Sequence, residues 1–289
     1  MPSESKVSLD RIEVALWEWP GREPAIFLCH ATGFHARVWD QIVQRLDGHH
    51  CYAPDMRGHG RSSKPAPPYA WRNFGEDIAA IADKLALRDA IGVGHSMGGH
   101  AIALAAALRP DTFSRLVLID PVIRAREEYR GAWRESHFVS KRRNRWASAQ
   151  EMFERFRDRP PFTAWDRTVL RDYCEYGVLP DGDGFVLACP PAIEASIYEN
   201  SPMPASNIHD EIATIRIPVE VVRSTKEVDP ADIMGRSPTT PGLAANFAQG
   251  KDLPIAEYSH FIPMEGPEFT AKLIAAASGG NALSQSSLL

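Results

Sequence analysis

The chain has 289 residues, of which 44% are hydrophobic and 24% charged, and its formal net charge at pH 7 is −5. This composition is ordinary for a chain with a packed apolar core, and the mild negative charge provides no basic field for nucleic acid. No apolar run approaches the roughly 20 residues that a membrane span needs, so we expect neither a nucleic-acid nor a membrane partner. The length suffices for one large α/β domain with an insertion.

The cysteines and the N-terminus indicate a reducing compartment. Residues 1–6 are polar and contain no apolar signal segment. The cysteines show neither close pairing nor metal-ligand spacing, and the chain has no phosphate-binding loop or dinucleotide fingerprint. We therefore expect a cytoplasmic protein with reduced thiols, no metal and no cofactor. The cysteines are Cys29, Cys51, Cys174 and Cys189.

Strand and helix patterns alternate over the first hundred residues. Residues 7–19 alternate between apolar and polar, which predicts an antiparallel strand ended by a Pro-Gly turn. The continuous apolar run 25–29 is typical of a strand buried in a parallel sheet. The adjacent His49 and His50 have no third ligand at metal-binding spacing, so we expect surface histidines. The other elements expected here are a helix over 38–46, a strand over 49–53, a helix over 74–87 and a buried strand over 90–93.

One short run carries the strongest chemical signal. Residues 94–98 read Gly-His-Ser-Met-Gly, between the strand at 90–93 and an alanine- and leucine-rich helix at 101–108. A nucleophilic Ser96 needs this context, because its hydroxyl must project from a sharp, strained turn at which the next helix points its N-terminus. The flanking glycines would keep side chains out of the closest backbone approaches. A capping serine in a glycine-rich turn is the simpler interpretation, but the flanking strand and helix favour the nucleophile.

The composition changes in the middle of the chain. Residues 115–119 predict another buried strand, which ends at the carboxylate of Asp120. From 122 to about 210 the chain is rich in Arg, Glu, Trp and Phe, with helical periodicity and no clear buried strand. Within this segment, the basic run 140–146 predicts a solvated helix face or, alternatively, a docking site for an acidic substrate tail. The elements expected after it are strands over 217–223 and 253–258, a helix over 269–277 and a frayed tail from residue 278.

Four stretches together resemble the α/β-hydrolase family, and in particular its serine-nucleophile, esterase- and lipase-like members with a helical cap. They occur in the order that the family uses and span most of the chain. They read Phe-Leu-Cys-His-Ala-Thr-Gly-Phe at 27–34, Pro-Asp-Met-Arg-Gly-His-Gly-Arg-Ser at 54–62, Gly-His-Ser-Met-Gly at 94–98 and Ser-His-Phe-Ile-Pro-Met-Glu at 259–265.

The resemblance implies a fold and a domain organisation. We expect an α/β fold whose mostly parallel central sheet is flanked by helices. Residues 1–121 and 211–289 would form this core. Residues 122–210 would form an inserted helical cap, or lid, that covers Ser96 and controls access to it.

The resemblance also assigns roles to individual residues. Ser96 would be the nucleophile, and His260, which follows the last strand, would be the base that takes its proton. The backbone amides of Thr32 and Met97 would form the oxyanion hole, since a tetrahedral oxyanion needs two such donors. His30 is expected to order its loop rather than to act as a base.

The carboxylate that orients the base has two candidates. The family usually places it in a Gly-x-x-Asp loop, but here residues 224–227 read Ser-Thr-Lys-Glu, and Asp229 follows. Some relatives carry the acid one strand earlier, where this chain has Asp120. We favour Asp120, because it directly follows a buried strand and its short side chain would be held rigidly. Glu227 is the alternative acid, although Lys226 could pair with it at the surface.

These expectations lead to a serine hydrolase that cleaves a small or medium carboxylic ester, thioester or lactone through an acyl-enzyme. Hydrolysis of a carbon–carbon bond in a β-diketone-like substrate is an alternative on the same machinery. A non-catalytic protein that holds a small ligand is a second alternative. The expected partner is a small-molecule substrate with an apolar portion, and the sequence leaves the oligomeric state open.

Overall fold

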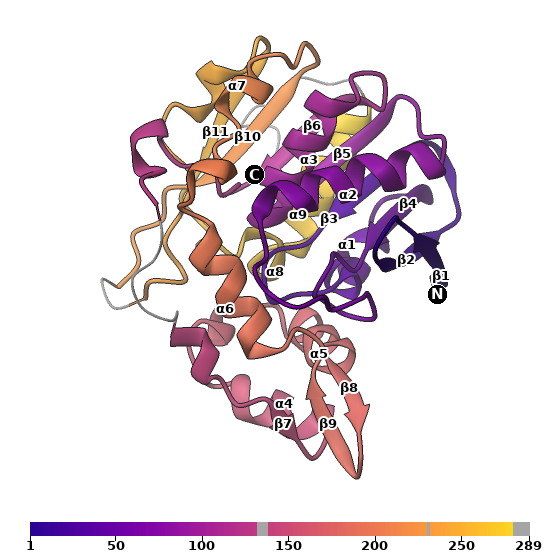
Figure 1. The fold of residues 1–289 in the computed structure, drawn as a ribbon, viewed down its shortest axis with the longest axis vertical. Helices are drawn as coiled ribbons and strands as arrows, with labels where there is room; N and C mark the ends of the chain where they lie inside the picture. The colour runs from indigo at the N-terminus through magenta and orange to yellow at the C-terminus, as the bar shows by residue number, and fades with distance from the viewer. Residues whose placement is uncertain (132–137, 230–231, 280–289) are drawn as a thin grey trace.

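The computed structural model, which describes residues 1–131, 138–229 and 232–279, is built on an eight-stranded sheet (Figure 1). The strand order is β1-β2-β4-β3-β5-β6-β10-β11. The β1–β2 and β2–β4 pairs are antiparallel and the other pairs are parallel, which confirms the expected α/β fold. The strands are β1 (Ser3–Ser8), β2 (Glu13–Trp19), β3 (Arg22–Cys29), β4 (His49–Pro54), β5 (Ala90–His95), β6 (Phe113–Ile119), β10 (Val219–Ser224) and β11 (Gly250–Ile255).

The N-terminal edge of the sheet differs from the expectation of a single strand over 7–19. Two antiparallel strands, β1 and β2, form a hairpin there instead. The turn between them is closed by the amide of Leu9, which donates to the carbonyl of Ile12 at 2.8 Å. The polar pair Asp10-Arg11 at its tip breaks the apolar alternation, and this was the turn signal that the prediction passed over.

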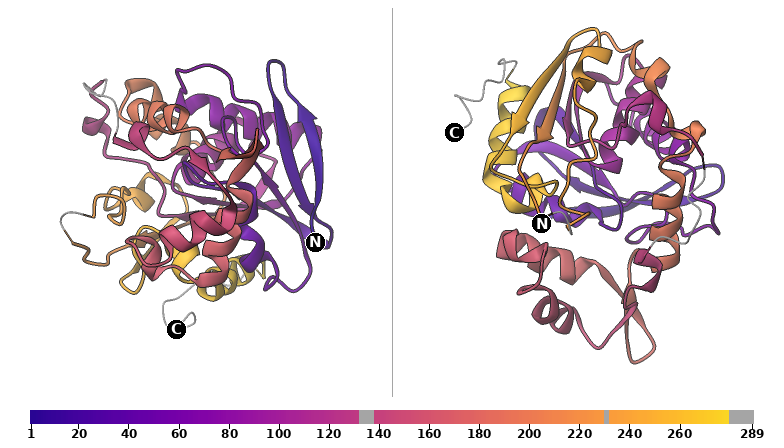
Figure 2. Two further views of the ribbon diagram at one scale, coloured as in Figure 1. Left: turned by 90° about the horizontal axis from the view of Figure 1, so that it is seen from below. Right: turned by 90° about the vertical axis from the view of Figure 1, so that its left-hand side faces the viewer.

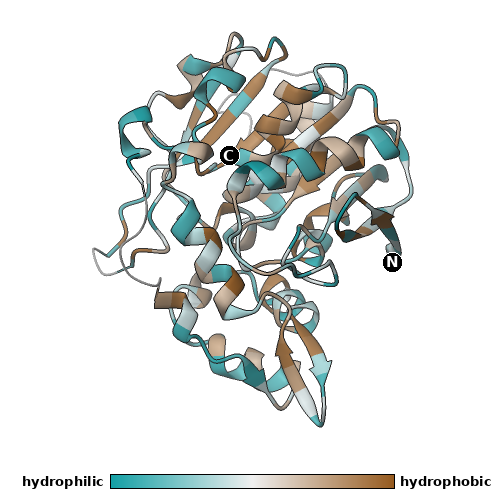
Figure 3. Ribbon diagram, viewed as in Figure 1, coloured by the Kyte–Doolittle hydropathy of each residue, from teal (hydrophilic) through white to brown (hydrophobic). Residues whose placement is uncertain are grey.

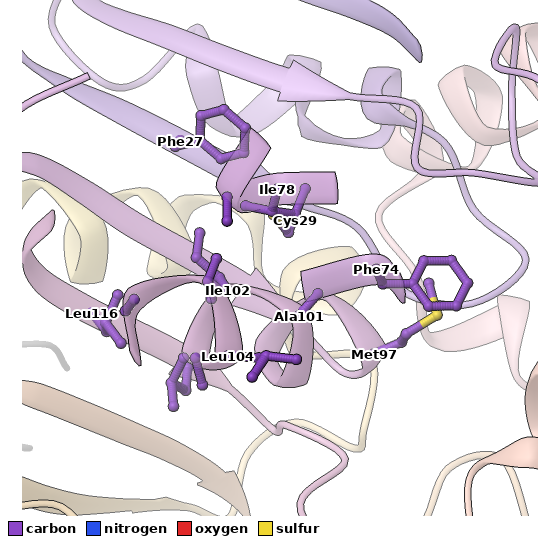
Figure 4. Packing of buried hydrophobic residues seen from close by; sticks show 14 of the residues in the cluster. Phe27, Cys29, Phe74, Ile78, Met97, Ala101, Ile102, Leu104 and Leu116 are labelled. Carbon is purple, nitrogen blue, oxygen red and sulfur yellow. The ribbon is translucent and has the colours of Figure 1, made fainter. Parts of the chain in front are cut away.

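Helices cover both faces of the sheet (Figure 2). Helices α2 and α3 pack on one face and α1 and α9 on the other, and each layer has its own apolar cluster. The central strands are brown in Figure 3 because strands covered on both faces are apolar almost throughout. Figure 4 shows part of the α2–α3 cluster, in which Ile78 and Ile102 pack with Phe27 of β3. The helices outside the insertion are α1 (Asp40–Val43), α2 (Trp71–Lys84), α3 (Met97–Leu108), α7 (His209–Ile212), α8 (Ile262–Glu265) and α9 (Pro267–Ser278), with single turns η1 (Ala36–Trp39) and η6 (Leu243–Asn246).

Most of the segment between β6 and β10 extends below the sheet in Figure 1 and in the right-hand view of Figure 2, whereas α7, near its end, lies at the top of Figure 1. This segment contains a three-stranded antiparallel sheet, β7-β9-β8, that the sequence did not predict. Its strands are short and mostly not buried, which agrees with the expectation that the segment holds no clear buried strand. A two-residue loop with Gly182 at φ 64° joins β8 to β9. The two loop residues are Gly182 and Asp183, and a Gly-Asp pair between two strands commonly marks a tight hairpin. The elements are η2 (Arg126–Glu128), η3 (Phe138–Lys141), β7 (Arg145–Trp146), α4 (Ala149–Phe156), η4 (Phe162–Ala164), α5 (Arg167–Tyr176), β8 (Val178–Asp181), β9 (Gly184–Leu187), α6 (Pro191–Asn200) and η5 (Pro204–Ser206).

Two further expectations concern the membrane and the C-terminal tail. Among the residues that the structure describes, no helix combines the length and the apolar character needed to cross a bilayer. The expected frayed tail falls mostly on residues 280–289, which lie outside the described part of the chain.

Candidate active site

Ser96 lies on a sharp turn between β5 and α3. Its backbone has φ 57° and ψ −119°, in the region that L-residues rarely adopt. The neighbouring glycines explain how the turn can be this tight. A β-carbon on Gly94 would lie 2.3 Å from the carbonyl oxygen of Gly98, and one on Gly98 would lie 2.2 Å from the carbonyl oxygen of Cys29. Larger residues at either position would push α3 away from the sheet and move the hydroxyl.

His260 connects Ser96 to Asp120. It lies between β11 and α8, and its Nε2 is 3.1 Å from Oγ of Ser96. Its Nδ1 is 2.7 Å from Oδ2 of Asp120. With the ring proton on Nδ1 donated to the carboxylate, Nε2 is left to accept the serine hydroxyl. All three side chains are buried, so water competes little for these hydrogen bonds.

The carboxylate of Asp120 is held from several sides. It follows β6 in a left-handed conformation with φ 44°, and its amide donates to the carbonyl of Val222. Its Oδ1 accepts hydrogen bonds from the amide of Ser224 at 3.0 Å, from Oγ of Ser237 at 2.5 Å and from Oγ1 of Thr239 at 3.2 Å. These donors leave Oδ2 directed at His260.

Glu227 and Asp229, the other carboxylates considered for this position, are both exposed. They lie on the segment after β10, where the amide of Thr225 still donates to Ile255 of β11. Lys226 lies 3.6 Å from Glu265 rather than pairing with Glu227. The structure therefore brings Asp120 to His260, while Glu227 lies on the surface.

The two residues predicted for an oxyanion hole lie beside Ser96. Met97 is the first residue of α3, so its amide is among the four that have no acceptor inside the helix. Thr32 lines the same cavities as Ser96, and its Oγ1 is 3.3 Å from the sulfur of Met97. The loop of Thr32 is ordered by His30, whose Nε2 accepts from the amide of Met56 and whose Nδ1 donates to Ala31. Burial lowers the pKa of His30 to about 3, which suits a neutral, structural imidazole.

His95, the residue before the serine, was not predicted to take part in the site. Its Nε2 lies 2.9 Å from the backbone carbonyl of His260, and the two rings are 5.0 Å apart between centroids. Burial, reinforced by the neighbouring His260, holds the pKa of His95 well below its usual value. A neutral His95 that donates to this carbonyl fixes the loop of the proposed base. No sequence motif indicates this contact, because the two residues are 165 positions apart.

Two cavities share Ser96, His260 and Thr32. The larger, of about 240 Å³, is lined mainly by aromatic side chains and is called here the aromatic arm. The smaller, of about 150 Å³, is lined by two arginines among apolar residues and is called the arginine arm. The aromatic arm is defined by Phe34, Phe156, Phe162, Trp165, Tyr173 and Phe261, and the arginine arm by Trp71, Val122, Arg124, Ile233, Arg236 and Pro238.

A charged pair that the sequence did not predict lies in the wall of the aromatic arm. Arg142 is 2.5 Å from the carboxylate of Glu194 and donates to the hydroxyl of Tyr173 at 3.2 Å. Burial opposes the charge of Arg142, but Tyr173 and Glu194 outweigh it and raise its pKa. Burial also raises the pKa of Glu194, which the pair with Arg142 only partly opposes.

The expectation of a solvated helix face over the basic run 140–146 is wrong in part: Lys141, Arg143 and Arg145 are exposed, but the run is not a helix. Arg142 is directed inward to Glu194. Arg143 pairs with Glu151 at 2.6 Å, and Arg145 pairs with Asp181 at 2.7 Å. The run contains the short strand β7. Its arginines pair with acids from other segments, and the spacing of charges within the run could not predict these pairs.

The histidine pair at 49–50 also differs in part from the expectation. His50 is near Glu18, at 2.8 Å, but His49 is buried, with its Nδ1 3.4 Å from the carbonyl of Pro24. Within the described ranges no group of His, Cys, Asp and Glu side chains is arranged to hold a metal ion. The four cysteines are buried and unpaired.

Comparison with known proteins adds to this geometry. The model of the Alpha/beta hydrolase family matches residues 26–273. The chain is 27% identical to the 2-(acetamidomethylene)succinate hydrolase of Mesorhizobium japonicum, over 93% of this chain and 92% of that protein. It is 33% identical to a bifunctional esterase/perhydrolase of Acinetobacter calcoaceticus, over 39% of this chain and 42% of that protein. A solved structure of E-2-(acetamidomethylene)succinate hydrolase superposes with a TM-score of 0.73 at 23% identity, covering 95% of this chain and 98% of that one.

Proposed function

Since the chain belongs to the alpha/beta hydrolase family, we propose that it is a serine hydrolase that cleaves a small or medium carboxylic ester, thioester or lactone. The observation that carries the proposal is the position of His260, 3.1 Å from the hydroxyl of Ser96 and 2.7 Å from the carboxylate of Asp120. A serine hydroxyl is a weak nucleophile near neutral pH, and this arrangement supplies both the base and the group that orients it.

In the proposed reaction Ser96 attacks the carbonyl carbon of the substrate while Nε2 of His260 takes the serine proton. Asp120 keeps the ring oriented and stabilises the imidazolium that forms. The amides of Met97 and Thr32 donate to the oxyanion of the tetrahedral intermediate. His260 then protonates the leaving group, the acyl-enzyme remains, and water activated by His260 releases the acid and restores Ser96.

We also propose that residues 122–210 act as the cap, with 1–121 and 211–289 as the core. In support, Phe162 and Trp165 from this segment line the cavity that contains Ser96, together with Phe34 and Phe261 from the core. An aromatic wall of this kind favours an apolar portion of the substrate and keeps water from the reacting carbonyl. The cytoplasmic location and the absence of nucleic-acid and membrane partners remain expectations from composition.

Amide hydrolysis is a second candidate, and one comparison favours it. The relative aligned over nearly the full chain is named for hydrolysis of 2-(acetamidomethylene)succinate, which contains an acetamido group. The proposed machinery can cleave an amide if His260 protonates the departing nitrogen, which is a poorer leaving group than an alkoxide. Ester and amide analogues of one acyl group, assayed side by side, distinguish the two candidates.

A fluorophosphonate probe tests the proposal directly, because it reacts with an activated serine. We expect the wild-type chain to be labelled and Ser96→Ala to be unlabelled while keeping its circular dichroism spectrum. Ser114→Ala, at a serine that hydrogen-bonds the carbonyl of Asp89, serves as the matched control and stays labelled. A wild-type chain that resists the probe would point instead to a non-catalytic ligand-binding protein.

A further inference from the structure

The aromatic arm contains an ion pair among its aromatic side chains. Apart from the proposed base His260, its described lining has two charged residues, Arg142 and Glu194. Both belong to the segment between β6 and β10, and both line the cavity that contains Ser96. A mainly apolar pocket with a few convergent polar groups is typical of small-molecule sites, in which the polar groups orient the ligand and provide specificity.

The two charges neutralise each other, but they leave hydrogen-bonding groups for a ligand. Nη1 of Arg142 donates to Oε2 of Glu194 at 2.5 Å, and Nη2 donates to the hydroxyl of Tyr173 at 3.2 Å. These are the side-chain hydrogen bonds of Arg142 within the described residues, so its other N–H groups can donate to a ligand. The hydroxyl of Tyr173 accepts from Arg142 and keeps its own proton to donate.

The burial of this pair indicates a role in binding. The side chain of Glu194 is 4% exposed and that of Arg142 is 24% exposed. A buried ion pair contributes little to stability, because the cost of removing two charges from water offsets their attraction. Apolar side chains of similar size often serve the fold equally well. Stability therefore does not account for the placement of Arg142 and Glu194 in the wall of the cavity beside Ser96.

The carboxylate of Glu194 lies against the loop proposed to hold the oxyanion. A β-carbon on Gly33 would lie only 2.7 Å from Oε1 of Glu194, so the carboxylate packs on the backbone of this glycine. Gly33 directly follows Thr32, and its amide donates to Nε2 of His59 at 3.0 Å. A substrate whose reacting carbonyl is bound at Thr32 can therefore reach the ion pair through a short chain.

The charges of the pair discriminate between classes of ligand. A carboxylate bound to Arg142 would also approach Glu194, and the two negative charges would repel each other. A neutral oxygen group meets no such repulsion. A carbonyl oxygen can accept from Arg142 and Tyr173, and a hydroxyl group can in addition donate to Glu194. Hydrogen bonds to charged groups are stronger than those between neutral groups, so this contact would add to specificity.

We propose that Arg142, Tyr173 and Glu194 bind a neutral oxygen function, a carbonyl or a hydroxyl group, on the acyl chain of the substrate. The proposal rests on the hydrolase function proposed above and specifies its substrate class. The acyl chain would be short, with this one polar group among apolar carbons that lie in the aromatic arm. The three residues act in binding and specificity, and the cleavage of the bond is unchanged.

Ethyl esters of three kinds test the proposal in a pH-stat assay at pH 8. Ethyl pentanoate and ethyl hexanoate have plain chains, ethyl 4-oxopentanoate and ethyl 5-oxohexanoate carry a ketone, and monoethyl succinate and monoethyl glutarate carry a carboxylate at the same carbon. We expect the wild-type kcat/KM for at least one ketone ester to exceed that for its plain counterpart about tenfold or more, since a plain chain leaves the donors without this acceptor. The matching carboxylate ester should be a poorer substrate than the ketone ester.

A charge-changing variant connects this preference to the ion pair. Glu194→Gln keeps the length of the side chain and an acceptor for Arg142, but it removes the negative charge that repels an anion. The preference should therefore shift from the ketone ester toward the carboxylate ester by about tenfold or more in the ratio of kcat/KM. A purely structural role of Glu194 would lower the activity on all the esters alike and leave this ratio unchanged.

A double variant and a control complete the test. Arg142→Met combined with Glu194→Met removes both charges without leaving one unpaired. It should lower the ketone-to-plain ratio of kcat/KM about tenfold, mainly by raising KM for the ketone ester. Arg145→Met, at an exposed ion pair with Asp181 outside the lining, is the matched control and should leave all the ratios as in the wild type. Circular dichroism checks the fold of each variant, and Glu194→Gln decides if the double variant does not fold.

The outcomes separate this proposal from the proposed function. A wild-type chain that reacts with the fluorophosphonate but hydrolyses ketone and plain esters equally overturns the polar site and leaves the hydrolase standing. A wild-type preference for the carboxylate esters, or a Glu194→Gln variant with unchanged ratios, contradicts the polar site as well. A chain that resists the fluorophosphonate contradicts the hydrolase. In that case calorimetry with ethyl 4-oxopentanoate and ethyl 5-oxohexanoate still decides, because binding no tighter than that of their plain counterparts contradicts the polar site.

Discussion

The structure adds most to the sequence prediction at Asp120, because it gives the contacts that orient this carboxylate toward His260. Its carboxylate accepts from Ser224, Ser237 and Thr239 on one oxygen and faces His260 with the other. A base oriented in this way keeps the tautomer that the reaction needs. Three donors hold the carboxylate of Asp120 in place. Replacing Asp120 by an amide should therefore change which nitrogen of His260 carries the proton more than it changes the positions of the side chains.

We expect Asp120→Asn to reduce kcat by about ten-thousandfold, the size of the loss seen when the corresponding acid of a serine protease is made an amide. The amide would donate to Nδ1 and favour the tautomer in which Nε2 carries a proton and cannot accept one. Glu227→Gln, on the exposed segment, should retain most of the activity. Steady-state hydrolysis of p-nitrophenyl acetate measures both.

The opposite result, an active Asp120→Asn and an inactive Glu227→Gln, would mean that the segment after β10 rearranges when substrate binds. If both variants remain active, Asp229→Asn is the next variant to assay. Circular dichroism and the thermal midpoint must be recorded for each, since Asp120 is fully buried and its hydrogen bonds also support the fold.

At the level of elements, a hydrogen bond joins the inserted segment to the core. Gln41 on α1 donates from its amide to the carboxylate of Asp172 on α5 at 2.8 Å. Burial raises the pKa of Asp172 to about 6; the hydrogen bond from Gln41 opposes the shift and the nearby Asp40 adds to it. The native state therefore holds a proton on Asp172 that the unfolded chain releases at lower pH.

Because the pKa of Asp172 is higher in the native state than in the unfolded chain, this residue makes the fold less stable as pH rises. The contribution of Asp172 is fully present below its unfolded pKa near 4 and is lost as pH rises through about 6. Above that pH the half-buried carboxylate carries its charge and destabilises the fold. We expect Asp172→Asn, which keeps an acceptor for Gln41, to raise the free energy of unfolding at pH 8 by about 1–2 kcal/mol, after allowance for solvent screening.

Urea unfolding at pH 8 and at pH 4 measures this effect. The advantage of Asp172→Asn over wild type should shrink at the lower pH, because the wild-type carboxyl is then protonated in the native state and residue 172 is uncharged in both proteins. Asp183→Asn, in the exposed turn between β8 and β9, is the control and should change little at either pH. An advantage that is the same at both pH values would show that titration of Asp172 is not its cause.

At the scale of the whole molecule, the aromatic arm is built from both parts of the chain. Phe34, from the loop after β3, has its ring 5.5 Å from Trp165 and 5.3 Å from Tyr173. Trp165 in turn lies 5.3 Å from Phe261, next to the proposed base. These rings both attach the inserted segment to the core and shape the cavity, so packing and substrate fit depend on the same side chains.

From the aromatic arm we predict how kcat/KM depends on the length of the acyl chain. Each methylene buried in it should contribute about 0.8 kcal/mol, so kcat/KM for p-nitrophenyl esters should rise roughly fourfold per methylene until the arm is full. Phe162→Ala enlarges the arm and should move the optimum to longer chains. Phe185→Ala, in the small sheet and outside the lining, is the matched control. A wild-type kcat/KM that does not change with acyl length would contradict binding of the acyl group in the aromatic arm.

Local patterns in the sequence were sufficient for the fold class and for the turn at Ser96. Buried parallel strands are apolar runs, and the strand–turn–helix with its two glycines is contained within about 15 residues. The placement of His260 after the last strand also followed from a contiguous motif. The hairpin at 3–19 and the small sheet at 145–187 were missed because their turn signals were short and lay within apolar or charged patterns.

Only the tertiary structure determined which side chains from distant parts of the sequence contact one another. Strands β6 and β10 are neighbours, so acids from either could be near His260, and only the side-chain geometry brings Asp120 there. The same holds for Glu194, which neutralises Arg142 across 52 residues, and for Arg124 and Arg236, which line one cavity from segments more than a hundred positions apart. Local composition specifies which element forms, but charge balance and cavity shape depend on which elements pack together, and no window of sequence contains that information.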